Sequence, residues 1–144
     1  LLDDLLESMK DQIDTSRVLI NIELKVHEII YIREFLKSII KNLLSNAIKY
    51  RNKKEPRVDV SWLAKDGYHE VKVKDNGVGI DLDKYGDRLF LPFKKIHENK
   101  KMGMGVGLHI VKTMVERNGG FIEVESEPGK GSVFTAYLKP YKEQ

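Results

Sequence analysis

Hydrophobic positions near the start of the chain change from helical spacing to strand spacing. Steps of three and four residues predict an amphipathic helix at the N-terminus, formed by Leu2, Leu5, Leu6, Met9 and Ile13. Two alternatives fit this stripe. It could be the end of a helix whose apolar face packs on a partner helix, or it could belong to an ordinary surface helix. Apolar residues at every second position then predict a strand over residues 18–26, with a short extension at 29–32.

The middle of the chain combines a dense helix with a hairpin. Closely spaced apolar positions predict a long helix over residues 34–50, and strands are expected at 57–65 and 68–74. The dipeptide Asp66-Gly67 between these strands is a strong signal for a tight turn. Residues 75–105 contain glycines, a proline and lysines with little periodicity, so we expect a long loop of the kind usually kept for function.

The last third of the chain contains one more helix and one more hairpin. The helix is expected over residues 106–117, ending at Asn118-Gly119-Gly120, and strands at 121–126 and 132–138 close the chain. Hairpins combined with two helices predict the α/β class. The expected architecture is a two-layer sandwich in which helices cover one face of a mixed, mainly antiparallel sheet.

Length, charge and cysteine content limit the kinds of site. With 144 residues the chain has the size of one domain, so we look for a single site. The 25 Lys and Arg are interleaved with 22 Asp and Glu, which argues against nucleic acid as the main partner. The absence of cysteine excludes a disulfide framework and a thiolate metal site. No apolar run approaches the roughly 20 residues of a membrane helix, so we expect a cytoplasmic domain without membrane contact, whose parent protein could still be anchored.

Polar residues form one stripe on the helix predicted over residues 34–50. The stripe members, separated by one helical turn each, are Ser38, Asn42, Asn46 and Lys49. Such a stripe is usually the solvent face, and that alternative stays open for this segment taken alone. A solvent face normally carries Lys and Glu, however, whereas two asparagines supply neutral amide oxygens that suit Mg²⁺. Lys49 could offset phosphate charge.

The second hairpin strand leads into the run Asp75-Asn76-Gly77-Val78-Gly79-Ile80. Because Asp75 shares a face with Val71 and Val73, its carboxylate is expected on the covered side of the sheet, where it needs a hydrogen-bond donor. The exocyclic amino group of adenine is such a donor. Glycines at positions 77 and 79 would leave room for a ring beside the backbone. The alternative is an ordinary Asp-Asn-Gly turn.

Glycines alternate directly before the last predicted helix. Gly103, Gly105 and Gly107 leave backbone N–H groups free at a helix N-terminus, where phosphate oxygens can bind. A flexible hinge explains the glycines equally well, and their spacing is not the dinucleotide fingerprint. The preceding segment suits either a basic lid over a triphosphate or a solvated surface, and its cations are Arg88, Lys94, Lys95, Lys100 and Lys101.

Together and in this order, these segments resemble the motifs of the histidine-kinase-type ATP-binding domain. The motifs are the N-x-x-x-N helix, the D-x-G-x-G strand end, Leu89-Phe90-Leu91-Pro92-Phe93 and the G-x-G-x-G-L loop. The family, often called GHKL, includes sensor histidine kinases, gyrase-type ATPases and protein-serine kinases. The resemblance covers residues 17–139 and implies a Bergerat-type α/β sandwich that holds ATP between its two long helices under a lid.

The resemblance also implies a role for each matching residue around the phosphates. Asn46 would coordinate Mg²⁺, Asn42 would support the metal or the phosphates, and Lys49 would reach a phosphate. The closing lid and the phosphate-facing helix would use Gly103, Gly105, Gly107 and Leu108.

The adenine end of the site is implied in the same way. Asp75 would bind the amino group of adenine, directly and through water, and Tyr50 could stack near the base. The wall beside the ring would consist of Gly77, Gly79 and Ile80. Phe90 and Phe93 would anchor the lid.

The residue one turn before Asn46 separates the branches of this family. ATPase and serine-kinase members carry a Glu there, which orients or deprotonates the attacking group. Sensor histidine kinases typically carry an asparagine, as this chain does at Asn42. The resemblance therefore implies the ATP-binding half of a sensor histidine kinase, which donates the γ-phosphate of Mg-ATP to a histidine on another domain. A response regulator would be the partner of the full-length kinase.

The phosphoacceptor histidine is expected to lie outside this chain. None of the four histidines has the acidic residue and the proline that follow an acceptor in this family; they are His27, His69, His97 and His109. His109 is expected on the surface of a helix, and His97 could touch the lid or the phosphates. Residues 1–14 are expected to end a helix from a missing dimerisation-phosphoacceptor domain, and residues 15–144 to form the ATP-binding domain.

Three other functions remain as alternatives. A degenerate domain could hold nucleotide, or none, and act as a scaffold for partner proteins. A GHKL ATPase and a protein-serine kinase are disfavoured, because both need a carboxylate where this chain has Asn42.

Overall fold

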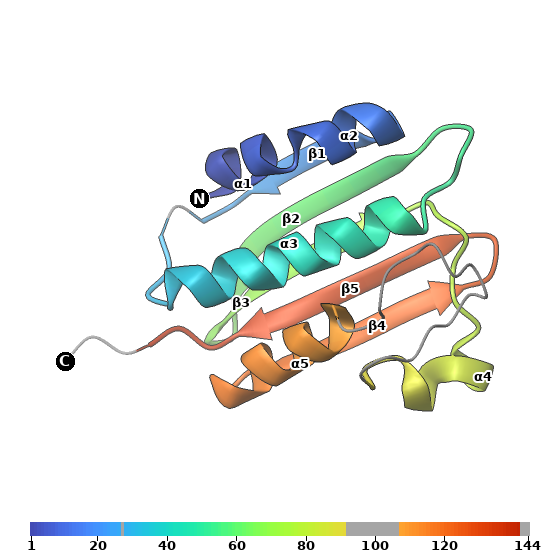
Figure 1. Ribbon diagram of the computed structural model, residues 1–144. Helices are drawn as coiled ribbons and strands as arrows, with labels where there is room; N and C mark the ends of the chain where they lie inside the picture. The colour runs from blue at the N-terminus through green and yellow to red at the C-terminus, as the bar shows by residue number, and fades with distance from the viewer. Residues whose placement is uncertain (27, 92–106, 142–144) are drawn as a thin grey trace.

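One sheet organises the molecule. The computed structural model describes residues 1–26, 28–91 and 107–141. The strands, in the spatial order β1-β2-β3-β5-β4, are β1 (Leu19–Leu24), β2 (Arg57–Lys65), β3 (Tyr68–Asp75), β5 (Gly131–Leu138) and β4 (Phe121–Glu127). The β1–β2 pair is parallel and the other pairs are antiparallel. One face is covered by α1 (Leu2–Ser8), α2 (Lys10–Ser16), α3 (Arg33–Lys49) and α5 (Gly107–Arg117) (Figure 1). The expected α/β two-layer sandwich is confirmed.

The central strands separate core from surface by simple alternation. Every second side chain of β2 and β3 is buried, at Val58, Val60, Trp62, Val71, Val73 and Asp75. In the turn between these strands, Asp66 has φ 55° and Gly67 has φ 83°. Two consecutive left-handed residues are the geometry of a type I′ hairpin turn, which an Asp-Gly dipeptide favours. The predicted hairpin is therefore confirmed.

Helix α3 provides the largest single part of the core. Its buried residues are Leu36, Ile39, Ile40, Leu43, Leu44, Ala47 and Ile48. Burying one such large side chain stabilises the fold by about 1.5–3 kcal/mol. These contacts hold the apolar face of α3 on the sheet, and they thereby fix the orientation of its polar face. No helix in the described ranges is long and apolar enough to span a membrane.

The N-terminal helical segment differs from its prediction. It is two short helices, because the chain leaves helical geometry at Met9 (φ −101°, ψ 7°) between α1 and α2. Leu5 is 0% and Met9 is 2% exposed, and both belong to the same core as α3. The domain itself therefore buries part of the stripe, while Leu6 and Ile13 are only half-buried. Contact of this stripe with a partner helix stays a prediction. The domain boundary expected at residue 14 stays a prediction.

Part of the segment predicted as a long loop is also helical. It contains α4 (Leu82–Tyr85) and a 3-10 turn, η1 (Gly86–Arg88). The Asp81 side chain caps α4 by accepting a hydrogen bond from the Lys84 N–H at 3.3 Å. A one-turn helix has too few positions to show a hydrophobic period, which explains why the sequence pattern missed it.

Candidate functional site

One residue of the polar stripe of α3, Asn42, faces the start of α5. Ser38, Asn42 and Asn46 are half-buried, and Lys49 at the helix end is exposed. The Asn42 amide nitrogen donates to the Ser38 carbonyl oxygen at 2.7 Å and lies 3.2 Å from its hydroxyl oxygen. A Cβ on Gly107 would lie 3.0 Å from Asn42 Oδ1, so this oxygen is directed at the first residue of α5. The solvent-face alternative is wrong for Asn42.

Asn46 lies one turn further along the same helix face. Its half-buried side chain makes no hydrogen bond to any residue in the described part of the chain. An amide oxygen in this state is available to a metal ion or to water. The first N–H groups of α5 have no intrahelical acceptor and carry the positive end of the helix dipole. The packing of α3 on α5 thus brings the amide oxygen of Asn42 close to N–H groups that can bind an anion.

Asp75 ends β3 with its carboxylate on the core side of the sheet. It is 7% exposed and follows Val71 and Val73 on the buried face, as the period-two pattern predicts. Its Oδ1 accepts the Gly77 N–H at 2.8 Å, which is an Asx turn. Burial raises the pKa of Asp75, and backbone hydrogen bonds from Gly77 and Ser132 oppose this rise. The turn alternative is correct for the backbone, but the carboxylate it contains is also a buried acceptor.

Two glycines allow the segment after β3 to pack between α3 and the β4–β5 hairpin. A Cβ on Gly77 would lie 2.2 Å from the Tyr50 carbonyl oxygen, and one on Gly79 would lie 2.0 Å from the Glu127 carbonyl oxygen. Gly79 also has φ 73°. Both glycines were expected to leave room for a bound ring, whereas backbone of the same protein occupies this space. Their contact with a nucleotide stays a prediction.

The β4–β5 hairpin is a part of the site that sequence analysis missed. The Ser126 hydroxyl accepts the Ile80 N–H at 2.7 Å and lies 2.7 Å from the Ser132 hydroxyl. The Gly129 N–H donates to the Val78 carbonyl oxygen at 2.8 Å. These bonds hold the whole D-x-G-x-G segment against the hairpin. The two serines meet only because β4 pairs with β5, and this register has no local signal in the sequence.

Phe90 is held by both the sheet and α5. Its ring packs edge-to-face on Phe134 with centroids 6.4 Å apart, and Lys112 Nζ lies 5.4 Å from its centroid. His109 Nδ1 lies 3.2 Å from the Phe90 carbonyl oxygen and must be the donor, because a carbonyl only accepts. The expectation that His109 is simply a surface residue of the helix is therefore wrong. It connects α5 to the segment that follows η1.

Several predicted residues lie outside the described residues, so their positions stay predictions. They are His27, Phe93, Lys94, Lys95, His97, Lys100, Lys101, Gly103 and Gly105.

Comparison with known proteins provides the family. Residues 31–142 match the family described as histidine kinase-, DNA gyrase B-, and HSP90-like ATPase. The chain belongs to this family. It is an ATP-binding domain, and the Asn42–Asn46 face, the Asp75 turn and the start of α5 are the described parts of its candidate nucleotide site.

Relatives of this ATPase-family domain include a phytochrome and proteins named as sensors. Cyanobacterial phytochrome A of Nostoc sp. is 36% identical over 100 residues, which are 69% of this chain and 13% of that protein. The phosphate regulon sensor protein PhoR of Pseudomonas aeruginosa is 35% identical over 108 residues, 73% of this chain and 24% of that protein. A structure of the mycobacterial sensor histidine kinase MprB has a TM-score of 0.79 at 23% identity and covers 97% of each chain. This chain thus spans a quarter or less of the length of the two curated relatives.

The other candidate site residues lie at the end of α3, after β3 and on α5. Tyr50 is half-buried, burial raises its pKa, and its carbonyl oxygen accepts the Val78 N–H at 3.0 Å. Ile80 is 6% exposed, and Leu108 on α5 is half-buried. Tyr50 and Ile80 therefore flank the Asp75 turn, while Lys49 extends from the exposed end of α3.

The donor set of the domain fits a magnesium ion only together with phosphates. Among the described residues, no three His, Cys, Asp or Glu side chains are grouped as an all-protein metal site. Mg²⁺ bound with ATP needs only one or two protein oxygens, because water and phosphate oxygens fill its other positions. The half-buried amide of Asn46 provides one such oxygen.

Proposed function

We propose that this domain binds Mg-ATP and donates the γ-phosphate to a histidine on a separate dimerisation domain of a two-component sensor kinase. The observation that carries the proposal is the neutral amide of Asn42, which faces the first residue of α5, together with a second neutral amide, Asn46, one turn further along the same helix. A domain that serves an imidazole elsewhere must hold and orient the triphosphate, but it need not activate water. The relatives PhoR and MprB, which are named as a sensor protein and a sensor histidine kinase, support the same function.

Each described part of the site has one task in this function. Asp75 accepts a hydrogen bond from the adenine amino group and thereby selects the base. The N–H groups at the start of α5 would bind phosphate oxygens, and the amide oxygen of Asn46 would hold Mg²⁺. When bound, Mg²⁺ neutralises charge that develops on the phosphate oxygens. Asn42, fixed by Ser38, keeps its oxygen next to the same helix start.

Transfer itself needs orientation rather than a base in this domain. A nitrogen of the acceptor imidazole forms a bond to the γ-phosphorus, while the bond from that phosphorus to the β–γ bridging oxygen breaks and ADP leaves. The phosphohistidine would then supply a response regulator. A water molecule near the γ-phosphate meets an amide instead of a carboxylate at position 42, so hydrolysis lacks a general base there.

A transfer assay tests the proposal. The chain is incubated with γ-labelled ATP and with a separately produced dimerisation domain of the sensor kinase. We expect alkali-stable, acid-labile label on the histidine of that domain, and almost no phosphate release by the chain alone. Steady phosphate release by the chain alone would instead indicate an ATPase. Absence of nucleotide binding at millimolar concentration would leave the scaffold function.

Asn46→Asp is expected to change the magnesium dependence of binding. A carboxylate beside the phosphates adds a negative charge, so ATP binding without Mg²⁺ should weaken by about tenfold, while Mg²⁺ should restore most of the affinity. Calorimetric titration of ATP with and without Mg²⁺ measures both effects. Asn21→Asp, on the exposed edge strand β1, adds the same charge elsewhere and should change neither. Equal behaviour of the two variants would contradict the metal role of Asn46.

A further inference from the structure

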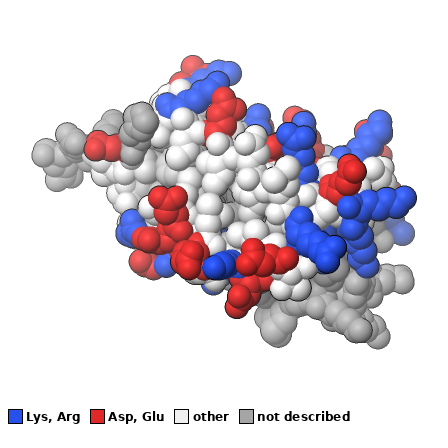
Figure 2. Space-filling model, turned by 90° about the horizontal axis from the view of Figure 1, so that it is seen from above, with Lys and Arg blue, Asp and Glu red and all other residues white. Residues whose placement is uncertain are grey.

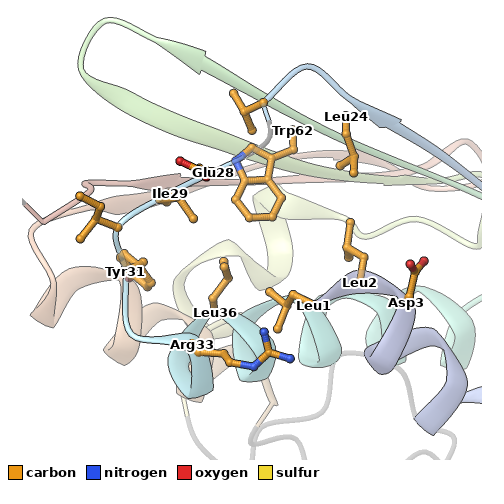
Figure 3. Close-up of a pocket in the computed structure, with 12 residues that line it drawn as sticks. Leu1, Leu2, Asp3, Leu24, Glu28, Ile29, Tyr31, Arg33, Leu36 and Trp62 are labelled. Carbon is orange, nitrogen blue, oxygen red and sulfur yellow. The ribbon is translucent and has the colours of Figure 1, made fainter.

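A cleft lies at the opposite end of α3 from the nucleotide site. Its volume is about 550 Å³, and its walls come from α1, the end of β1, the segment before α3, the start of α3, and β2. Figure 3 shows Trp62 and Leu24 on the sheet side of the cleft, opposite Leu2 and Leu36 on the helical side. Leu36 and Asn46 are ten residues apart on α3, which is roughly 15 Å along the helix axis. The cleft is thus separate from the groups that hold ATP.

Apolar side chains remain exposed around the cleft. Leu24 in its wall is 46% exposed and Ile30 is 43% exposed, while the adjacent Ile32 is 40% exposed. Exposed apolar side chains that gather beside a cleft are typical of an interaction site, whereas single ones scattered over a surface need no explanation. Figure 2, which looks down on the α1–β1 side, shows a broad zone without charged side chains across the middle of this face.

The charges at the cleft are mostly negative. Asp3 and Glu28 belong to its lining, are exposed and have no ion pair with any residue in the described ranges. The cation of the lining, Arg33, is already paired with Asp4 at 3.1 Å. In Figure 2, acidic side chains lie around the uncharged zone, with Lys and Arg side chains between them. A partner that fits here combines apolar side chains with basic ones.

We propose that this cleft docks a basic amphipathic helix of a partner protein. Apolar side chains one helical turn apart would enter between Trp62 and Leu36, and covering Leu24 and Ile30 would remove their apolar surface from water. Lysine or arginine side chains beside that apolar stripe would pair with Asp3 and Glu28. The two carboxylates lie on two sides of an apolar opening. A helix with basic side chains can pair with both of them, whereas a small apolar molecule would pair with neither.

Trp62 provides a direct measurement, because it is the single tryptophan of the chain. The probe is a helical peptide of leucine and lysine, and its matched control is a leucine–glutamate peptide of the same pattern. Trp62 Nε1 donates to His69 Nδ1 at 2.8 Å, so the titration is run well above 6.5, the ordinary histidine pKa, which burial lowers further for His69. We expect a saturable change of tryptophan emission with the lysine peptide and none with the glutamate peptide.

Two pairs of variants locate the binding surface. Leu24→Ser should weaken the lysine peptide by about tenfold, the effect of losing one buried leucine contact. Leu19→Ser removes a still more exposed apolar side chain, 64% against 46%, from the other sheet face of the same strand and should leave affinity unchanged. Asp3→Asn with Glu28→Gln should weaken binding several-fold, and the loss should shrink as salt is added. Glu123→Gln with Glu125→Gln, on the far edge strand β4, is the charge-matched control.

Several results would overturn the proposal. These are an emission that does not respond to the lysine peptide, equal responses to both peptides, and equal losses in the cleft and control variants. Self-association of the chain that Leu24→Ser abolishes would assign the cleft to a second copy. Unfolding midpoints of all four variants, measured by circular dichroism, show whether any loss of binding reflects a loss of folding.

Discussion

Asp75→Asn is expected to weaken ATP and ADP binding by at least about a hundredfold, because the amino group of adenine loses the buried carboxylate that accepts its hydrogen bond. In the variant, the single amide oxygen remains occupied by the Gly77 N–H, and the amide nitrogen would face the amino group of adenine, donor against donor. Calorimetry with either nucleotide measures the loss. Asp66→Asn, in the exposed hairpin turn, is the matched control and should bind like the native chain.

The same substitution should stabilise the domain without nucleotide. Burial raises the pKa of Asp75 above its ordinary value of 3.8, so the folded state binds the proton more tightly than the unfolded state does. The carboxyl group of Asp75 therefore stabilises the folded state at a pH below 3.8, and this stabilisation is lost as the pH rises through the pKa of the folded state. Since asparagine carries no charge, Asp75→Asn should unfold at a higher denaturant concentration than the native chain at neutral pH, and the difference should disappear in acid.

This pair of results separates function from folding at Asp75. A variant that loses nucleotide binding but gains stability identifies the carboxylate as a binding group that the fold alone does not need. A variant less stable than the native chain at neutral pH would contradict this account. It would mean that the hydrogen bonds from Gly77 and Ser132 outweigh the cost of burying the charge.

Gly79→Ala is expected to destabilise the domain by about 3 kcal/mol or more, through a backbone clash added to an unfavourable φ. The new Cβ would lie 2.0 Å from the Glu127 carbonyl oxygen and 3.0 Å from Pro128 Cα, both of which belong to backbone that cannot rotate away. The turn after β3 would have to leave the β4–β5 hairpin. The hydrogen bond between the Ile80 N–H and the Ser126 hydroxyl would then break. Urea unfolding of the native and variant chains measures the loss.

Gly67→Ala is the matched control for this effect. Gly67 also has a left-handed backbone, with φ 83°, but a Cβ there would have no atom within 4 Å. Gly67→Ala should lower the free energy of unfolding by only about 1 kcal/mol, because alanine is unfavourable in a left-handed backbone but meets no clash here. The difference between the two variants isolates the close approach of the Asp75 turn to the hairpin. If both variants lose the same stability, the packing of Gly79 against Glu127 has no energetic role.

Much of the site followed from local patterns. Period two along β3 places Asp75 behind Val71 and Val73 on the buried face, and the structure confirms this orientation. The turn after Asp66 forms because an Asp-Gly dipeptide tolerates two left-handed residues in succession. Spacing along α3 also grouped Asn42 with Asn46 correctly. Each of these predictions depends only on residues close together in the chain.

Predictions failed or stayed incomplete where the answer depended on what covers a surface. The stripe of Leu5 and Met9 showed an apolar face, but its spacing could not show that α3 and the sheet of the same domain bury it. Helical periodicity likewise placed His109 on an exposed face of α5, whereas the carbonyl of Phe90 lies against it. In both cases the partner comes from another element of the fold.

By itself, the sequence determined which segments are helices and strands, which face of each is apolar, and which polar residues share a face, because backbone geometry and turn chemistry act over a few residues. Only the tertiary structure decided that Gly77 and Gly79 meet the backbone at Tyr50 and Glu127, and that Ser126 holds the Ile80 N–H. Those contacts join segments far apart in the chain. They depend on strand register and on helix packing, which emerge only when all the apolar faces are buried together.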